Sequence, residues 1–157
     1  HLLRALHHLH SHLFVHGDIK PANLMWFGDE AKGAWKLIDL DGLRVQGELL
    51  DMRDADFYTA IYASPEVAGA VANAGALRLS GRLDVWAAGL ILLELDRLRP
   101  VLATVFEGFC RDGEGGLPAF FAWLSGDSDL PSQAPRVASG ELLQLVTDCM
   151  LAKEPTR

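Results

Sequence analysis

The chain has 157 residues, of which 50% are hydrophobic and 22% are charged, and this fits one compact domain with a sizeable core. Its 14 lysines and arginines against 21 aspartates and glutamates give a net charge of −7, which disfavours a general surface for nucleic acid or anionic membrane. The longest uncharged apolar run, residues 85–93, is shorter than the ~20 residues that span a bilayer. Cys110 and Cys149 alone form no disulfide framework or zinc cluster, which favours an intracellular, cytoplasmic location.

The first part of the chain predicts a helix, a polar loop and a small β-hairpin. Leucines and alanines recur at helical spacings over residues 2–13, which is typical of an amphipathic helix. Gly17 and Pro21 then interrupt regular structure. Two short apolar stretches at residues 23–27 and 34–40 flank a glycine-containing turn, as in a hairpin. Because the chain opens on His1 inside a helical pattern, we expect a fragment without an intact signal peptide.

The second part predicts mainly helices. Residues 41–63 have no clean period and predict a long loop, after which Pro65 starts a helix. The Ala- and Gly-rich residues 69–80 predict a surface insertion. Residues 82–98 are apolar on nearly every side, which indicates a buried central helix. Weaker patterns predict helices at residues 101–110 and 118–124, and a good amphipathic pattern predicts a last helix at residues 141–151.

Four polar residues around the predicted hairpin form a candidate site. Asp18 and Lys20 are two positions apart on the loop, so an extended backbone lets both face one reacting centre. Asn23 and Asp39 bring oxygen ligands from the two strands of the hairpin, and such oxygens suit Mg²⁺ that also binds phosphate. These residues together indicate metal-assisted phosphoryl transfer.

The same residues belong to a series of motifs that resembles the C-terminal lobe of eukaryotic-type protein kinases. The matching motifs are LHS at 9–11 leading into HGDIKPAN at 16–23, then KLIDLD at 36–41, TAIYASPE at 59–66, DVWAAG at 84–89, and CML with EPTR at 149–157. The resemblance covers essentially the whole chain. It implies an α+β fold that is mainly helical, with a small hairpin at the catalytic loop. It also implies that residues 1–157 are a partial kinase domain that lacks the N-terminal lobe. The implied parts of this domain are a catalytic loop at 16–23, a metal-binding motif at 39–42, an activation segment at 39–66 and a central helix at about 82–98.

The resemblance assigns chemistry to the four residues of the candidate site. Asp18 would orient and deprotonate the substrate hydroxyl, and Lys20 would stabilise the transferred phosphoryl group. Asn23 and Asp39 would hold the magnesium ions that neutralise the phosphates of ATP. A lysine two positions after the catalytic aspartate is typical of the family's serine/threonine members. The implied function is therefore transfer of the ATP γ-phosphoryl group to a Ser or Thr hydroxyl of a protein.

Five further residues have supporting roles by resemblance. Thr59 would hydrogen-bond close to the catalytic aspartate and lysine, which also favours Ser and Thr as acceptors. His16 would brace the catalytic loop, and Asp84 would hold its backbone. Glu66 would pair with Arg157 inside the lobe.

Two departures from the family pattern affect regulation and nucleotide binding. Gly17 replaces the arginine that normally binds a phosphorylated activation loop, and residues 43–57 contain no Ser, Thr or Tyr. We therefore expect any activity not to depend on phosphorylation within residues 43–57. Asp41 replaces the glycine of the metal-binding motif. It is expected to be a surface or turn acid, and its charge would weaken nucleotide binding.

The sequence contains no match to the glycine-rich loop, the ATP-anchoring lysine or its glutamate partner. We therefore expect the isolated chain to be inactive without an N-terminal lobe in cis, because kinase catalysis depends on positioning from both lobes. Two other functions stay open. A phosphotransferase of the aminoglycoside/choline type would also fit Gly17 and Asp41, whereas Lys20 and the TAIYASPE motif favour a protein kinase. A pseudokinase or binding lobe is the second alternative.

Overall fold

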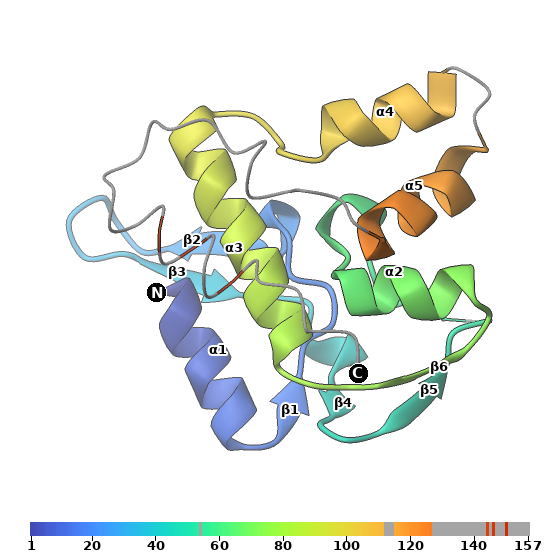
Figure 1. Cartoon of the computed structure of the whole chain (residues 1–157). Coiled ribbons are helices and arrows are strands. Elements are labelled where there is room, and N and C mark those ends of the chain that lie inside the picture. Colours follow the sequence, from blue (N-terminus) through green and yellow to red (C-terminus); the bar gives the residue numbers. More distant parts are fainter. Residues whose placement is uncertain (54, 112–114, 127–143, 145, 147–149, 151–157) are drawn as a thin grey trace.

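The computed structural model describes residues 1–53, 55–111 and 115–126, together with residues 144, 146 and 150. The described part is an α+β structure in which helices predominate and three small two-stranded antiparallel sheets lie around them. In Figure 1 helix α3 crosses the middle of the molecule. Helix α1 and the β2–β3 hairpin lie on one side of it, and helices α2, α4 and α5 lie on the other.

Helix α3 (Arg82–Arg97) forms the centre of the core. Its buried side chains come from nearly every side of the helix, as its apolar pattern predicts, and Ala88 and Leu90 have no exposed surface. Leu98, just after the helix, adopts the left-handed conformation that commonly ends helices. The buried residues of α3 are Leu83, Asp84, Trp86, Ala87, Ala88, Gly89, Leu90, Ile91 and Leu93.

The first part of the chain follows the prediction closely. Helix α1 (Leu2–Ser11) leads to strand β1 (Phe14–Val15) and the short 3₁₀ helix η1 (Pro21–Asn23). Strands β2 (Leu24–Phe27) and β3 (Ala34–Leu37) form the predicted hairpin, with Leu24 opposite Leu37. Gly28 is required in its turn, because it has φ +110° and a Cβ there would lie 2.7 Å from the Cα of Gly33.

The predicted long loop contains more regular structure than expected. Strand β4 (Arg44–Val45) pairs with β1, and strand β5 (Leu49–Asp51) pairs with β6 (Ala76–Arg78). Two 3₁₀ turns, η2 (Leu40–Gly42) and η3 (Ala60–Tyr62), lie at its ends. The strands are two or three residues long and pair with distant residues, so they leave no local period in the sequence.

The predicted surface insertion at residues 69–80 is wrong. Its first residues complete helix α2 (Pro65–Ala72), and strand β6 follows. Leu77 and Leu79 are buried with exposed fractions of 8% and 1%, while Arg78 between them is exposed. This alternation is that of a strand with one face on the core, and the surrounding alanines and glycines conceal it in the sequence.

The remaining described helices are α4 (Ala103–Arg111) and α5 (Gly116–Ser125), close to the predicted positions. Helix α5 packs on α2 and α4, with Phe120, Phe121 and Leu124 fully buried. The helix predicted at 141–151 lies outside the described residues apart from positions 144, 146 and 150. Among the described helices, none has the length and apolar character needed to cross a bilayer.

Candidate active site

Two polar side chains of the loop at residues 16–23 contact a third from the segment before η3. The Oγ1 of Thr59 donates to Oδ1 of Asp18 at 2.7 Å, and the Nζ of Lys20 donates to Oδ2 of Asp18 at 2.5 Å. Lys20 also donates to Oγ1 of Thr59 at 3.0 Å. The side chains of Asp18 and Lys20 keep 21% and 26% of their surface exposed. The site therefore presents a carboxylate, an ammonium group and a hydroxyl that hold one another in place and remain accessible.

The buried carboxylate of Asp84 holds the loop from below. Its Oδ2 accepts from the backbone N–H of His16 at 2.9 Å, and its Oδ1 accepts from the N–H of Gly17 at 2.8 Å. Asp84 is 1% exposed and lies in the first turn of α3, where the positive end of the helix dipole favours a negative charge. The loop is thereby attached to the central helix.

His16 connects the loop to the segment between β3 and Asp39. The ring is buried, with Nδ1 next to the backbone N–H of Asp18 at 3.3 Å and Nε2 next to the carbonyl oxygen of Ile38 at 3.1 Å. A neutral ring with its proton on Nε2 satisfies both contacts, since Nδ1 then accepts and Nε2 donates. Ile38, which precedes Asp39, is thereby held against His16, which precedes Gly17.

Asn23 and Asp39 lie at adjoining ends of the hairpin strands. The N–H of Ile38 donates to the carbonyl oxygen of Asn23 at 2.9 Å, which places Asp39 next to the end of β2. The side chain of Asn23 is buried, and its Nδ2 donates to the carbonyl oxygen of Asp18 at 2.8 Å. Its amide oxygen has no hydrogen-bond donor among the described residues and can therefore bind a ligand. Asp39 is exposed and has φ 63° and ψ 56°, a left-handed conformation that is uncommon outside turns and functional sites.

These two residues supply a set of oxygen donors that fits magnesium. One carboxylate and one amide oxygen beside a phosphate are typical of protein Mg²⁺ sites, which keep several waters. Asp41, the other acid of this segment, is exposed in η2.

The predicted pair of Glu66 and Arg157 lies only partly within the described residues. Glu66 is half-buried in the first turn of α2, beside a pocket of about 620 Å³ that Leu77 and Arg82 also line. Arg157 lies outside the described residues. The predicted pair therefore stays a prediction.

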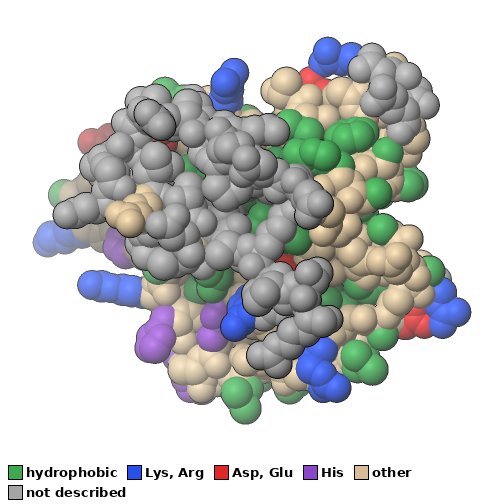
Figure 2. Space-filling model, in the orientation of Figure 1, with side chains coloured by type: hydrophobic (Ala, Val, Ile, Leu, Met, Phe, Trp, Pro, Cys, Tyr) green, Lys and Arg blue, Asp and Glu red, His purple; other side chains and the backbone are tan. Residues whose placement is uncertain are grey.

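His10 is a supporting residue that the sequence reasoning missed. Its Nε2 lies 2.8 Å from Oδ2 of Asp84, the same oxygen that binds the backbone of His16. A signal was present, because His10 lies four positions after Leu6, the buried residue of α1, and therefore on the same helix face. Further histidines of this part of the chain are exposed and gather at the surface (Figure 2), where the ring of His8 on α1 lies 4.5 Å from that of His12, the residue after the helix.

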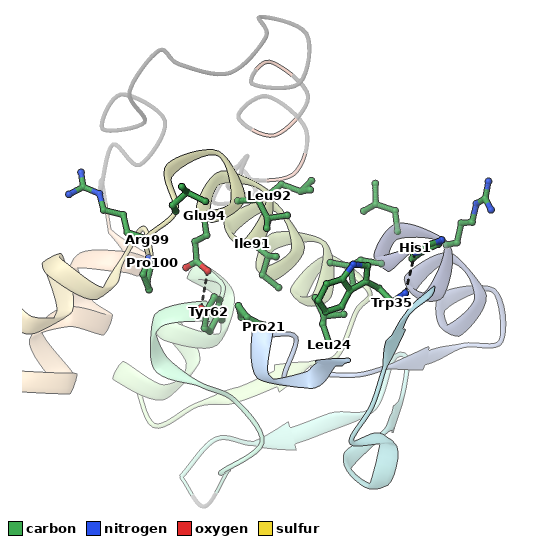
Figure 3. A pocket seen from close by; sticks show the side chains of 15 residues that line it. His1, Pro21, Leu24, Trp35, Tyr62, Ile91, Leu92, Glu94, Arg99 and Pro100 are labelled. Atoms are coloured by element: carbon green, nitrogen blue, oxygen red, sulfur yellow. Dashed lines mark hydrogen bonds between the residues drawn. The ribbon is translucent and has the colours of Figure 1, made fainter. Parts of the chain in front are cut away.

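A separate apolar pocket of about 920 Å³ lies between α1, the hairpin and the end of α3 (Figure 3). At one end the hydroxyl of Tyr62 donates to Oε2 of Glu94 at 3.0 Å, and at the other the N–H of Trp35 donates to Nδ1 of His1. Burial raises the pKa of both Tyr62 and Glu94. The lining does not include Asp18, so this pocket is distinct from the candidate site.

Comparison with known proteins gives relatives that include cyclin-dependent kinases and a mitogen-activated protein kinase kinase. The chain is 32% identical over 117 residues to cyclin-dependent kinase 8 of Caenorhabditis elegans, a match that covers 71% of this chain and 18% of that protein. It is 34% identical over 103 residues to cyclin-dependent kinase E-1 of Arabidopsis thaliana, which covers 64% of this chain and 21% of the relative. It is 30% identical over 162 residues to mitogen-activated protein kinase kinase 7 of A. thaliana, covering 98% of this chain and 45% of the relative.

The chain thus spans between about a fifth and about half of the length of these relatives. The family model described as protein kinase domain matches residues 1–157. The motifs at the candidate site and this match along the whole chain agree, and the chain belongs to the protein kinase domain family.

Proposed function

We propose that the protein carrying this chain is a serine/threonine protein kinase that transfers the γ-phosphoryl group of ATP to a Ser or Thr hydroxyl of a protein substrate. The observation that carries the proposal is the cluster of Asp18, Lys20 and Thr59. A carboxylate held by an ammonium group on one side and a hydroxyl on the other is oriented before the substrate arrives, and positioning of this kind supplies much of the catalysis of phosphoryl transfer.

In this proposal each side chain has one task. Asp18 accepts the proton of the attacking hydroxyl, and Lys20 places its positive charge on the phosphoryl group in transfer. Asn23 and Asp39 hold Mg²⁺, which neutralises charge on the phosphates when it is bound. His16 and Asp84 keep the loop in position through the hydrogen bonds described above.

The choice of Ser or Thr on a protein rests on two features of this chain. Lys20 and Thr59 contact each other as well as Asp18, and the lysine position is the one that serine/threonine kinases use. The relatives are named as cyclin-dependent kinases and as a mitogen-activated protein kinase kinase. An intracellular, cytoplasmic location belongs to the same proposal, since ATP is abundant inside cells.

We further propose that residues 1–157 act as the C-terminal lobe and need an N-terminal lobe in cis. Their sequence has no counterpart of the glycine-rich loop or the ATP-anchoring lysine. Without those groups the phosphates would be bound from one side only. The isolated chain is therefore expected to be inactive.

The test measures Mg²⁺-dependent phosphoryl transfer from ATP by the isolated chain and by the two-lobed protein. Ser/Thr peptides are compared with small alcohols and amines as acceptors. We expect activity on the peptides from the two-lobed protein, with a loss of about 10²-fold or more in Asp18→Asn, because a general base contributes at least that much. The control is Asp29→Asn, since Asp29 is an exposed acid whose role is to accept two backbone hydrogen bonds in the hairpin turn.

Three outcomes would overturn the proposal. Robust peptide phosphorylation by the isolated chain, abolished by Asp18→Asn, contradicts the need for a second lobe. Transfer to small alcohols or amines in place of peptides indicates the aminoglycoside/choline type of phosphotransferase. A two-lobed protein that shows no thermal shift with Mg²⁺ and ATP is a pseudokinase or binding lobe.

A further inference from the structure

Gly17 lies against an aromatic ring of the activation segment. It has φ +83°, a left-handed conformation, and a Cβ built on it would lie 2.7 Å from Cδ2 and 3.2 Å from Cε2 of Phe57. Real Cβ atoms do not approach other atoms so closely. The ring of Phe57 therefore occupies the space that a side chain at position 17 would need.

Phe57 is itself anchored to the core through two more rings. It contacts Tyr58 edge-on, with ring centroids 5.8 Å apart and an interplanar angle of 89°. The ring of Tyr58 lies 5.7 Å from that of Phe121, which is fully buried on α5. Aromatic pairs at these distances attract each other beyond their buried area. The end of the activation segment is thus connected by apolar contacts from α5 to the catalytic loop.

The contact between Phe57 and Gly17 flanks the hydrogen bond at the catalytic centre. Asp18 follows Gly17 directly, and Thr59 is two positions after Phe57. The contact therefore fixes the backbone on both sides of the Thr59–Asp18 hydrogen bond, which is 2.7 Å long. If the ring moved, the hydroxyl of Thr59 would lose its place above the carboxylate.

The rest of the segment is also held without a phosphate. Its strands pair with β1 and β6, Met52 is 2% exposed, and the N–H of Met52 donates to the carbonyl oxygen of Gly75 at 3.0 Å. Residues 43–57 offer no hydroxyl that a kinase would phosphorylate. The position of this segment is accounted for by packing and backbone pairing.

We propose that Phe57 is a positioning residue that packs on Gly17 and holds Thr59 over Asp18, in place of a phosphate-dependent contact. This rests on the proposed kinase function for its catalytic consequence, although the packing itself does not. An apolar contact needs no modifying enzyme, so the site is assembled as soon as the lobe folds.

The first experiment measures amide hydrogen exchange in the chain itself and requires no activity. Phe57→Ala is expected to speed exchange at least tenfold at the N–H of Gly17, which binds Asp84, and at the N–H of Tyr62, which binds Thr59, relative to the amides of the hairpin. The matched control is Phe109→Ala, the same truncation of a half-buried ring on α4, which packs on Phe120 of α5. Equal effects of the two variants would overturn the positioning role.

A double-mutant cycle tests the steric contact directly. Gly17→Ala is made in the native protein and in the Phe57→Ala variant. The strain of a positive φ is common to both, so it cancels in the comparison. We expect Gly17→Ala to speed exchange at Asp18 and Tyr62 at least tenfold more when Phe57 is present. An effect of the same size in both proteins would contradict the contact.

The second experiment uses the two-lobed protein. Phe57→Ala is expected to lower kcat for a Ser/Thr peptide at least tenfold, while KM for ATP stays within twofold of its native value. Phe57→Leu keeps an apolar side chain and is expected to retain most of the native kcat. Treatment with a phosphatase is expected to leave kcat unchanged, and a tenfold loss would overturn the proposal. If the native protein transfers no phosphoryl group, the proposed function fails, and the exchange data still decide whether Phe57 holds the segment.

Discussion

Thr59 donates a hydrogen bond of 2.7 Å to Asp18 although the two residues are 41 positions apart in the chain. Lys20 occupies the other oxygen of the same carboxylate. Both oxygens are engaged, so the carboxylate has one orientation. The entropy cost of ordering the carboxylate is incurred during folding. The carboxylate therefore needs less reorganisation when a substrate hydroxyl arrives.

We predict that the hydroxyl of Thr59 contributes to turnover. Thr59→Ala removes the donor to Asp18 and is expected to lower kcat of the two-lobed protein about tenfold, the equivalent of ~1.4 kcal/mol. Thr59→Ser keeps the hydroxyl and should retain most of the activity. Steady-state kinetics on a Ser/Thr peptide measures both variants. If Thr59→Ser and Thr59→Ala reduce kcat equally, the hydrogen bond between Thr59 and Asp18 does not contribute to catalysis.

Asp84 is predicted to stabilise the fold through the catalytic loop. Asp84→Ala removes the acceptor of two backbone N–H groups and the partner of His10. Each buried N–H group left without its acceptor costs about 1–3 kcal/mol, and urea unfolding measures the total loss of stability in the isolated chain. Asp96→Ala is the control, because Asp96 is an exposed acid on the same helix and such changes stay within about 0.5 kcal/mol. Similar losses in both variants would contradict the prediction.

Local patterns predicted those parts of the fold that local interactions determine. Helix α1, the β2–β3 hairpin and helix α3 each carry a period or a turn signal within about a dozen residues. Strands β4, β5 and β6 do not, because each is two or three residues long and is stabilised by a partner far along the chain. This is why residues 69–80 were expected to form a surface insertion.

The candidate site shows the same division. The sequence identifies Asp18, Lys20, Asn23 and Asp39 because their joint pattern suggests phosphoryl transfer and resembles the motifs of protein kinases. His10 and Phe57 were not singled out, since their importance comes from the residues they meet, Asp84 and Gly17. A phenylalanine in an irregular segment has no local feature that reveals such a contact, and the spacing of His10 from Leu6 indicates the helix face on which His10 lies but not the residue that it meets.

Leu79 is predicted to be a core residue in spite of its Ala- and Gly-rich surroundings. It is 1% exposed, so Leu79→Ala should lower the free energy of unfolding by about 2–5 kcal/mol. Leu49→Ala is the matched control, since Leu49 lies on the paired strand β5 and is 59% exposed; its effect should stay below about 1 kcal/mol. Equal effects in urea unfolding would mean that Leu79, the residue after β6, is not packed on the core.

Glu94 is predicted to make stability depend on pH. Burial raises the pKa of its carboxyl above the ordinary 4.5, against the lowering effects of hydrogen bonds from Tyr62 and from the N–H of Val101. The folded state then binds more protons than the unfolded state once the pH exceeds 4.5, so the free energy of unfolding falls as pH rises through the folded pKa. The stabilisation is fully present below 4.5 and lost above the folded value.

Glu94→Gln isolates this effect, because the amide keeps an acceptor for Tyr62 and carries no charge to bury. At pH 4 we expect the urea concentration at which the variant unfolds to equal that of the native chain or to be lower. Between pH 4 and pH 7 we expect the variant to lose less stability than the native chain. Glu107→Gln is the control, since Glu107 is exposed and pairs with Arg111. If Glu94→Gln and the native chain show parallel pH profiles, the carboxyl of Glu94 titrates alike in the folded and unfolded states, and its burial carries no cost.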